Sequence, residues 1–366
     1  MSDWLGGLAL GVGGVLLIGL VLWDIFQTVV LPRPSSTRVR IARNMIRLSW
    51  PVWSWRAQRR STSVDREKIL GSYAPAIVLL VLVTWMVGMV IGFGLVMYSL
   101  REGISPTPDL GSALYFAGTS VLTIGFGDIA ATHGLARVAA VIAGGLGLGI
   151  VALGITYLFS LYGSFQRREI LVVRLEARAG APPSGIALLE SYGDPAMRSA
   201  LAPFFVEWEA WAAEVLDTHV AYPILAYFRS SHDDVSWVSA LGAVLDAAAL
   251  TLTTIENGPI GEALMAERVG SHFVEDLANF FGWPNTPLAL VERAEFNAAR
   301  DRLAAAGWRL TEAEGAWNAF VRLRSGYAFR LNQMALYWVT PPAEWIGDRG
   351  AIRHSPVTAP GAEPLT

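Results

Sequence analysis

Three long apolar stretches divide the first half of the chain, and each is long enough to cross a bilayer. They cover residues 5–31, 74–100 and 134–165, and a spanning helix needs ~20 residues. A fourth apolar stretch, residues 110–122, is long enough to cross only half of the membrane. The pattern predicts an all-α membrane protein with three transmembrane helices per subunit and a re-entrant loop.

The second half of the chain has apolar residues at helical spacing, interrupted by short segments rich in Gly, Pro and Asp. We predict helices over residues 195–230, 235–257, 260–281, 287–306 and 311–339. They would form a cytoplasmic all-helical domain, residues 169–340, followed by an irregular tail, residues 341–366. The stretch 235–257 is apolar enough to be a fourth span, but it contains Asp246 and has acidic flanks. We therefore expect a buried helix there, with a span as the alternative.

The first span belongs to a peripheral helix, residues 1–31. A basic segment, residues 32–70, follows it and leads to the second span. Ten of these residues are Lys or Arg, which places the segment in the cytoplasm by the positive-inside rule. Apolar residues recur near helical spacing from Val39 to Leu48, and Trp50, Trp53 and Trp55 follow. We expect an amphipathic helix at the inner membrane surface, with a plain basic loop as the alternative. The N-terminus would then lie outside.

The charges are unevenly distributed. Residues 1–165 hold 12 Lys and Arg against 7 Asp and Glu, whereas residues 166–366 hold 16 against 24. An acidic second half argues against nucleic-acid partners, and the absence of cysteine excludes disulfides and thiolate metal sites. Basic residues are almost all Arg and Ala is abundant, which suggests a bacterial source and hence the inner (plasma) membrane. The acidic start and the length of the first span are not typical of a cleaved signal peptide, so we expect that span to be retained.

The sequence Thr-Ile-Gly-Phe-Gly-Asp at residues 123–128 lies between the half-membrane stretch and the third span. A potassium filter needs a row of backbone carbonyls that replaces the water shell of the ion. Glycine at alternate positions permits the backbone dihedrals that this row requires. We therefore predict that Thr123, Ile124, Gly125, Phe126 and Gly127 bind the ion, with Ile124 and Phe126 directed away from the axis.

These residues resemble the signature of pore-loop potassium channels, and the Ile and Phe variants resemble filters of two-pore-domain animal channels. The spacing from Asp128 to Arg137 and on to Gly147 is similar to that of two-transmembrane bacterial potassium channels. The resemblance covers residues 71–168 and implies a pore domain of outer helix, pore helix, filter and inner helix. With one filter sequence per chain, it also implies a homotetramer. We expect no cofactor apart from potassium ions in the filter, and no enzyme activity.

The resemblance assigns supporting roles around the filter. Tyr115 and Phe116 stand where an aromatic cuff, usually two tryptophans, braces it, and Thr119 stands where some bacterial channels carry a glutamate. Asp128 matches the outer aspartate. Because Phe126 has no hydroxyl to bond to the cuff, we expect a more apolar and looser brace. Whether Asp128 still influences inactivation stays open.

The third span carries candidate gating residues. Gly147 falls at the family's hinge glycine, although small residues also let membrane helices pack closely. Leu148, Val151, Ile155 and Phe159 follow at helical spacing, and the resemblance makes them cavity-lining. A ring of Phe159 side chains could close the inner mouth by dewetting. Alternatively, these four residues pack in the core between neighbouring helices.

Two further groups are open to a functional or a structural interpretation. Asp24 is a costly intramembrane carboxylate, for which we expect an arginine partner from the basic segment, with proton or ligand sensing as the alternative. His219, His232, Asp233, Asp234 and His272 match no common metal spacing, and Asp233 or Asp234 suits a helix N-cap.

The sequence therefore predicts a potassium-selective channel in the lipid membrane. Its gate would be controlled by an unknown small-molecule or protein regulator acting through the helical domain. A non-selective cation channel and a membrane-anchored sensor with a vestigial pore are the alternatives.

Overall fold

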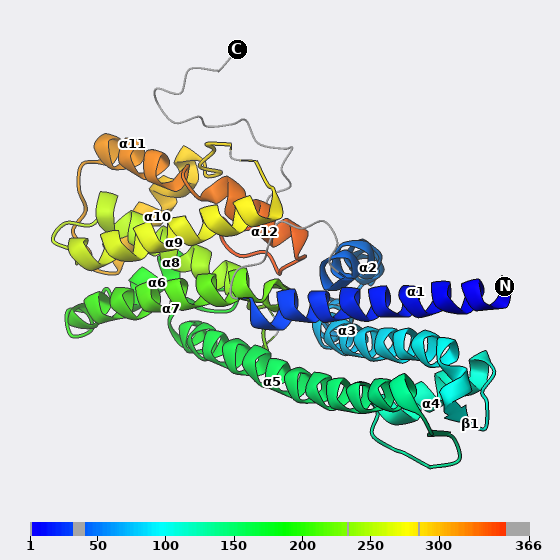
Figure 1. Cartoon of the computed structure of the whole chain (residues 1–366). Helices are drawn as coiled ribbons and strands as arrows, with labels where there is room; N and C mark the ends of the chain where they lie inside the picture. Colours follow the sequence, from blue (N-terminus) through cyan, green and yellow to red (C-terminus); the bar gives the residue numbers. More distant parts are fainter. Residues whose placement is uncertain (1, 32–40, 233, 285, 349–366) are drawn as a thin grey trace. The chain divides into compact units, whose positions relative to one another are not determined.

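The computed structural model describes residues 2–31, 41–232, 234–284 and 286–348, and it is almost entirely helical (Figure 1). The predicted tail beyond residue 348 lies outside the described residues. Contacts divide the chain into two compact units: Met1–Val52 with Tyr73–Tyr162, and Trp53–Ser72 with Gly163–Thr366. The predicted basic segment is thus shared between the units, and its residues 32–40 lie outside the described part.

The elements of the membrane half are α1 (Ser2–Ile25), a π-helical turn (Phe26–Val30), α2 (Ile41–Gln58), α3 (Ser63–Ser99), a 3₁₀ turn (Arg101–Gly103), β1 (Ile104–Ser105), α4 (Leu110–Val121), β2 (Ala130–Ala131) and α5 (Gly134–Ala179). In the described part of the chain, three helices are long and apolar enough to cross a membrane: the first from Leu5 to Val30, then α3 and α5. The protein is therefore an all-α membrane protein, as predicted.

Glycines allow α1 and α3 to approach closely. A Cβ added to Gly14 would lie 2.5 Å from the carbonyl oxygen of Gly92, and one added to Gly88 would lie 2.7 Å from Val21. Gly88 and Gly92 are four residues apart on one face of α3, the small-residue spacing that lets membrane helices pack.

Asp24 is 2% exposed and accepts two hydrogen bonds within this unit. Trp85 Nε1 donates at 2.8 Å and the backbone N–H of Ile41 at 2.7 Å. Among the described residues these donors take the place of the predicted arginine; Arg33, Arg38 and Arg40 lie outside the described part. Within the described residues, these two donors are what holds the carboxylate.

The second unit is a helical bundle. Its elements are α6 (Gly185–Ser191), a 3₁₀ turn (Arg198–Ala200), α7 (Leu201–Ala221), a second 3₁₀ turn (Pro223–Tyr227), α8 (Trp237–Thr253), α9 (Ile260–Phe281), α10 (Arg293–Ala305), α11 (Ala313–Arg324) and α12 (Ala328–Tyr337). The last turns of α5 and residues 53–72 belong to the same unit, and Arg229 Nε donates to Glu67 Oε2 at 2.7 Å.

Helix α8 is the centre of this bundle, with α6, α7, α9, α11 and α12 packed around it (Figure 1). Its residues from 237 to 251 are all buried. Asp246 accepts from Arg324 Nε at 2.8 Å and from the Tyr327 hydroxyl at 2.7 Å. The acidic residue in this apolar helix is thus paired inside the bundle, where the sequence predicted a buried helix.

Several predicted boundaries were wrong. The helix expected over 195–230 ends at Ala221, because Pro223 has no N–H to continue it. The helix expected over 311–339 is two helices separated around Gly326, a poor helix former. Helix α10 begins at Arg293 rather than near 287. Ser236 caps α8 in place of Asp234, while Asp233 lies outside the described residues. By contrast, the bounds predicted for α9 are confirmed.

Candidate functional site

The pore helix α4 runs into residues 123–128, the filter segment. Asp109 caps α4, because its side chain accepts from the backbone N–H of Ser112 at 2.7 Å. In the filter segment, φ is positive at Thr123 (57°), Gly125 (62°) and Gly127 (82°), and not at the residues between them. Such alternation of left- and right-handed residues turns successive carbonyl groups towards one side of the backbone. Glycine adopts it without strain, whereas Thr123 needs support from its surroundings.

Backbone hydrogen bonds from the pore helix provide that support. The carbonyl of Thr119 accepts from the N–H groups of Ile124 at 2.8 Å and Gly125 at 3.3 Å. The Thr123 N–H donates to the Ser120 carbonyl at 3.0 Å. The side-chain hydroxyl of Thr119 is buried and donates to the Phe116 carbonyl at 3.0 Å. The backbone carbonyl of Thr119 therefore holds the first residues of the filter segment, and its role as a filter support stays a prediction.

The aromatic brace combines an apolar and a polar contact. Tyr115 stacks on Phe126, with ring centroids 6.4 Å apart and an interplanar angle of 3°, and the Tyr115 hydroxyl interacts with the Asp128 carboxylate. Phe116 is buried. The interaction between Tyr115 and Asp128 was not predicted from the sequence. The looser brace and the cuff role of Tyr115 and Phe116 stay predictions.

Gly147 lies where the inner helix meets the end of the pore helix. A Cβ at this position would lie 1.8 Å from the carbonyl oxygen of Val121, whereas one at Gly145 would meet nothing within 4 Å. Close packing is therefore reason enough for glycine at 147. The hinge role stays a prediction.

The four predicted cavity residues share one exposed face of α5. Leu148, Val151 and Ile155 are about half exposed or more, and Phe159 is 75% exposed. They do not belong to the core of their own chain, so they are free to line a space or to contact another copy. Helix α5 then continues without a break to Ala179 (Figure 1), well past the end predicted at residue 165.

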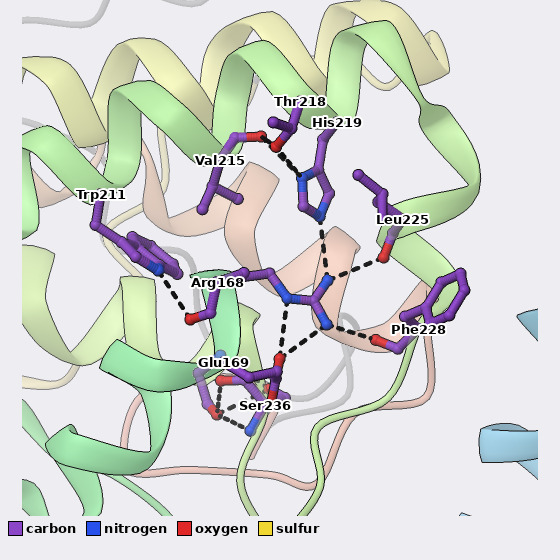
Figure 2. A network of polar contacts seen from close by, with 10 residues as sticks. Arg168, Glu169, Trp211, Val215, Thr218, His219, Leu225, Phe228 and Ser236 are labelled. Atoms are coloured by element: carbon purple, nitrogen blue, oxygen red, sulfur yellow. Dashed lines mark hydrogen bonds and ion pairs between the residues drawn. The ribbon is translucent and has the colours of Figure 1, made fainter. Parts of the chain in front are cut away.

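Just beyond this face, Arg168 is buried among five groups of the bundle (Figure 2). Its side chain is 1% exposed and forms an ion pair with Glu169 at 2.9 Å. It donates to the carbonyls of Leu225 and Phe228, each at 2.9 Å. Trp211 Nε1 donates back to the Arg168 carbonyl at 3.0 Å. We call Arg168, Glu169, Trp211, His219, Leu225 and Phe228 the Arg168 cluster.

His219 completes the cluster. Its Nε2 lies 3.1 Å from Arg168 Nη1 and its Nδ1 lies 2.8 Å from the Val215 carbonyl. Because a guanidinium only donates, Nε2 accepts and Nδ1 carries the proton, so the imidazole is neutral. Burial, together with the charge of Arg168, holds the pKa of His219 well below its usual value. Sequence spacing gave no signal for this contact.

His232 and His272 form separate surface pairs with acidic side chains. His232 contacts Glu176 at 2.8 Å and His272 contacts Asp276 at 3.3 Å. Within residues 2–31, 41–232, 234–284 and 286–348, no group of three acidic or histidine side chains could hold a metal ion.

Residues 85–163 match the model of a family described as "Ion channel". This range holds the last part of α3 from Trp85 to Ser99, the pore helix, the filter segment and α5 as far as Gly163. The match supports ion channel activity for this membrane protein. The chain is also 26% identical over 202 residues to the uncharacterized membrane protein YdjJ of Bacillus subtilis (strain 168). The alignment covers 54% of this chain and 58% of that relative's length. No solved structure matches the chain.

Proposed function

We propose that this protein is a potassium-selective channel that conducts passively through carbonyls of the filter segment. The observation that carries the proposal is the alternation of φ at Thr123, Gly125 and Gly127 directly after a short pore helix. A row of carbonyls along one side of the backbone can replace the hydration shell of K⁺ at several adjacent sites. The ion is the cargo, and Thr123, Ile124, Gly125 and Phe126 would bind it.

A single chain provides one wall of such a filter. Four copies around an axis would close the ring, which makes the homotetramer part of the proposal. The exposed filter segment and the exposed face of α5 from Leu148 to Phe159 support it, since both lack cover from their own chain. Crosslinking of the purified protein in lipid nanodiscs tests this state: a ladder ending at four is expected, and one ending at two contradicts the filter.

In the proposed topology the N-terminus lies outside and the bundle lies in the cytoplasm. The amphipathic helix α2 supports this arrangement, with Leu48, Val52 and Trp55 exposed and ten basic residues within or beside it. Labelling of a cysteine introduced after residue 257 decides the side, because the chain has none of its own. Labelling from outside alone would overturn the topology.

The bundle would gate the pore through α5. Helix α5 is continuous: it carries Phe159 and, nine residues later, Arg168, which is fixed in the bundle by buried polar contacts. A rearrangement of α7 or of the turn Pro223–Tyr227 would therefore act on the inner helix directly.

Ion flux through the full-length chain distinguishes the proposed potassium channel from a non-selective cation channel. Potassium-selective flux supports the potassium channel, whereas equal sodium and potassium permeability favours the non-selective channel.

A further inference from the structure

A cavity of about 690 Å³ opens into the bundle beside the last turns of α5. Its walls come from four places: Arg174 and Arg178 on α5, Tyr192 after α6, the start of α7, and Glu262 on α9. This volume lies within the range of small-molecule sites. The cavity is remote in sequence from the filter segment, and the proposed conduction pathway does not use it.

Three polar groups in the cavity wall have no hydrogen-bond or ion-pair partner in the described part of the chain: the Arg178 guanidinium, the Tyr192 hydroxyl and the Glu262 carboxylate. The Tyr192 residue is 2% exposed, but its hydroxyl stays accessible in the cavity wall, where water or a ligand can meet it. Burial raises the pKa of the Tyr192 phenol, and the nearby charge of Arg178 opposes that shift. Unpaired groups of this kind, held in one concave wall, are typical of a binding site.

The charges of the wall define the ligand further. Arg174 pairs with Glu207 and is neutralised within the protein. Among the described residues of the wall, this leaves Arg178 as a cation and Glu262 as an anion without an ion-pair partner. A simple anion would be attracted by Arg178 but repelled by the carboxylates of Glu207 and Glu262. A simple cation would be attracted by Glu262 but repelled by Arg178. A molecule with both charges suits the wall without leaving either group unpaired.

The rest of the wall is apolar. Pro203, Phe204, Val206 and two alanines line it, and the Phe204 ring is packed against Tyr192 with centroids 5.8 Å apart. Such a surface favours a hydrocarbon group on the ligand. The wall therefore combines an apolar patch, one guanidinium, one carboxylate and one hydroxyl.

We propose that this cavity binds a zwitterionic, amino-acid-like molecule with an apolar side chain. Its carboxylate would take the planar fork of Arg178 and a hydrogen bond from the Tyr192 hydroxyl. Its ammonium would pair with Glu262, and its side chain would lie on Pro203 and Phe204. No covalent step is involved. Because Arg174 and Arg178 belong to α5, the ligand would act on the helix that carries Phe159; this consequence rests on the proposed channel function, whereas the binding does not.

Binding is tested on the full chain in lipid nanodiscs by calorimetry and thermal unfolding. The probes are L-leucine and L-phenylalanine, each compared with the carboxylic acid that lacks its amino group and with the amine that lacks its carboxylate. We expect the amino acids to bind in the millimolar range or tighter, and both single-charge analogues to bind at least tenfold more weakly. Equal binding of acid and amino acid, or no binding of either amino acid, overturns the proposal.

Variants locate the site. Arg178→Gln and Glu262→Gln should each weaken binding at least tenfold, and Tyr192→Phe should weaken it several-fold. Arg322→Gln is the matched control, since this exposed arginine on α11 lies outside the cavity, and it should bind as the unaltered protein does. Unchanged binding in both charge variants would contradict the site. Potassium flux with and without the amino acid is a separate readout, so failed conduction does not affect the binding result.

Discussion

Replacing Arg168 by Met tests whether the end of the inner helix is fixed in the bundle. The variant keeps an unbranched side chain but removes the donors to Glu169, His219, Leu225 and Phe228. Each buried acceptor left without a partner costs about 1–3 kcal/mol, and breaking a buried ion pair costs about 3–5 kcal/mol in total. Because partly satisfied networks are not additive, we take about 3–5 kcal/mol as the local loss of stability.

The assay is amide hydrogen exchange on the full chain in detergent, read at residues 222–230 and in the last turns of α5. A loss of about 3–5 kcal/mol corresponds to exchange on the order of 10²–10⁴-fold faster. Arg167→Gln is the matched control. That neighbour is 55% exposed and pairs with a Glu214 that is 47% exposed, so removing it should cost about 0–1 kcal/mol. Equal exchange in the two variants would refute the structural role of Arg168.

Three further changes have expected outcomes. Gly147→Ala places a Cβ 1.8 Å from the Val121 carbonyl oxygen and should prevent the channel from assembling, whereas Gly145→Ala should be tolerated. Equal yields of assembled protein from the two variants on size-exclusion chromatography would contradict this packing. The lowered pKa of His219 means that the unfolded chain takes up its proton first, so stability should fall as pH drops below about 6.5, by up to about 1.4 kcal/mol per pH unit. His219→Gln should reduce the change of the unfolding free energy with pH. If that pH dependence is unchanged in the variant, other groups cause it. Phe159→Ala should raise basal potassium flux, and unchanged flux removes this gate.

The spans, the pore helix with its Asp109 cap and the bounds of α9 could be predicted because their signals are local. Apolar length, a capping residue and helical spacing are all read over a few turns of sequence. Residue 165 was predicted as the end of the inner helix because charges begin there. The charges end the apolar stretch, but the helix continues because its next turns are packed in the bundle.

The polar contacts of the bundle could not be predicted. Arg168 meets His219, Leu225 and Phe228, which lie 51, 57 and 60 residues further along the chain, and no periodicity brings them together. The same holds for Trp85 as a donor to Asp24 across 61 residues. The filter segment was recognisable for the opposite reason, because its geometry is encoded in six consecutive residues.

Ion flux from liposomes containing the purified protein tests the central proposal most directly. Potassium-loaded and sodium-loaded vesicles are compared, with barium as a blocker and Gly125→Ala as the variant that strains the filter backbone at φ 62°. The account predicts barium-sensitive flux of potassium over sodium, lost in the Gly125 variant. Equal flux of both ions would contradict selectivity, and silence even with Phe159→Ala would contradict the channel itself.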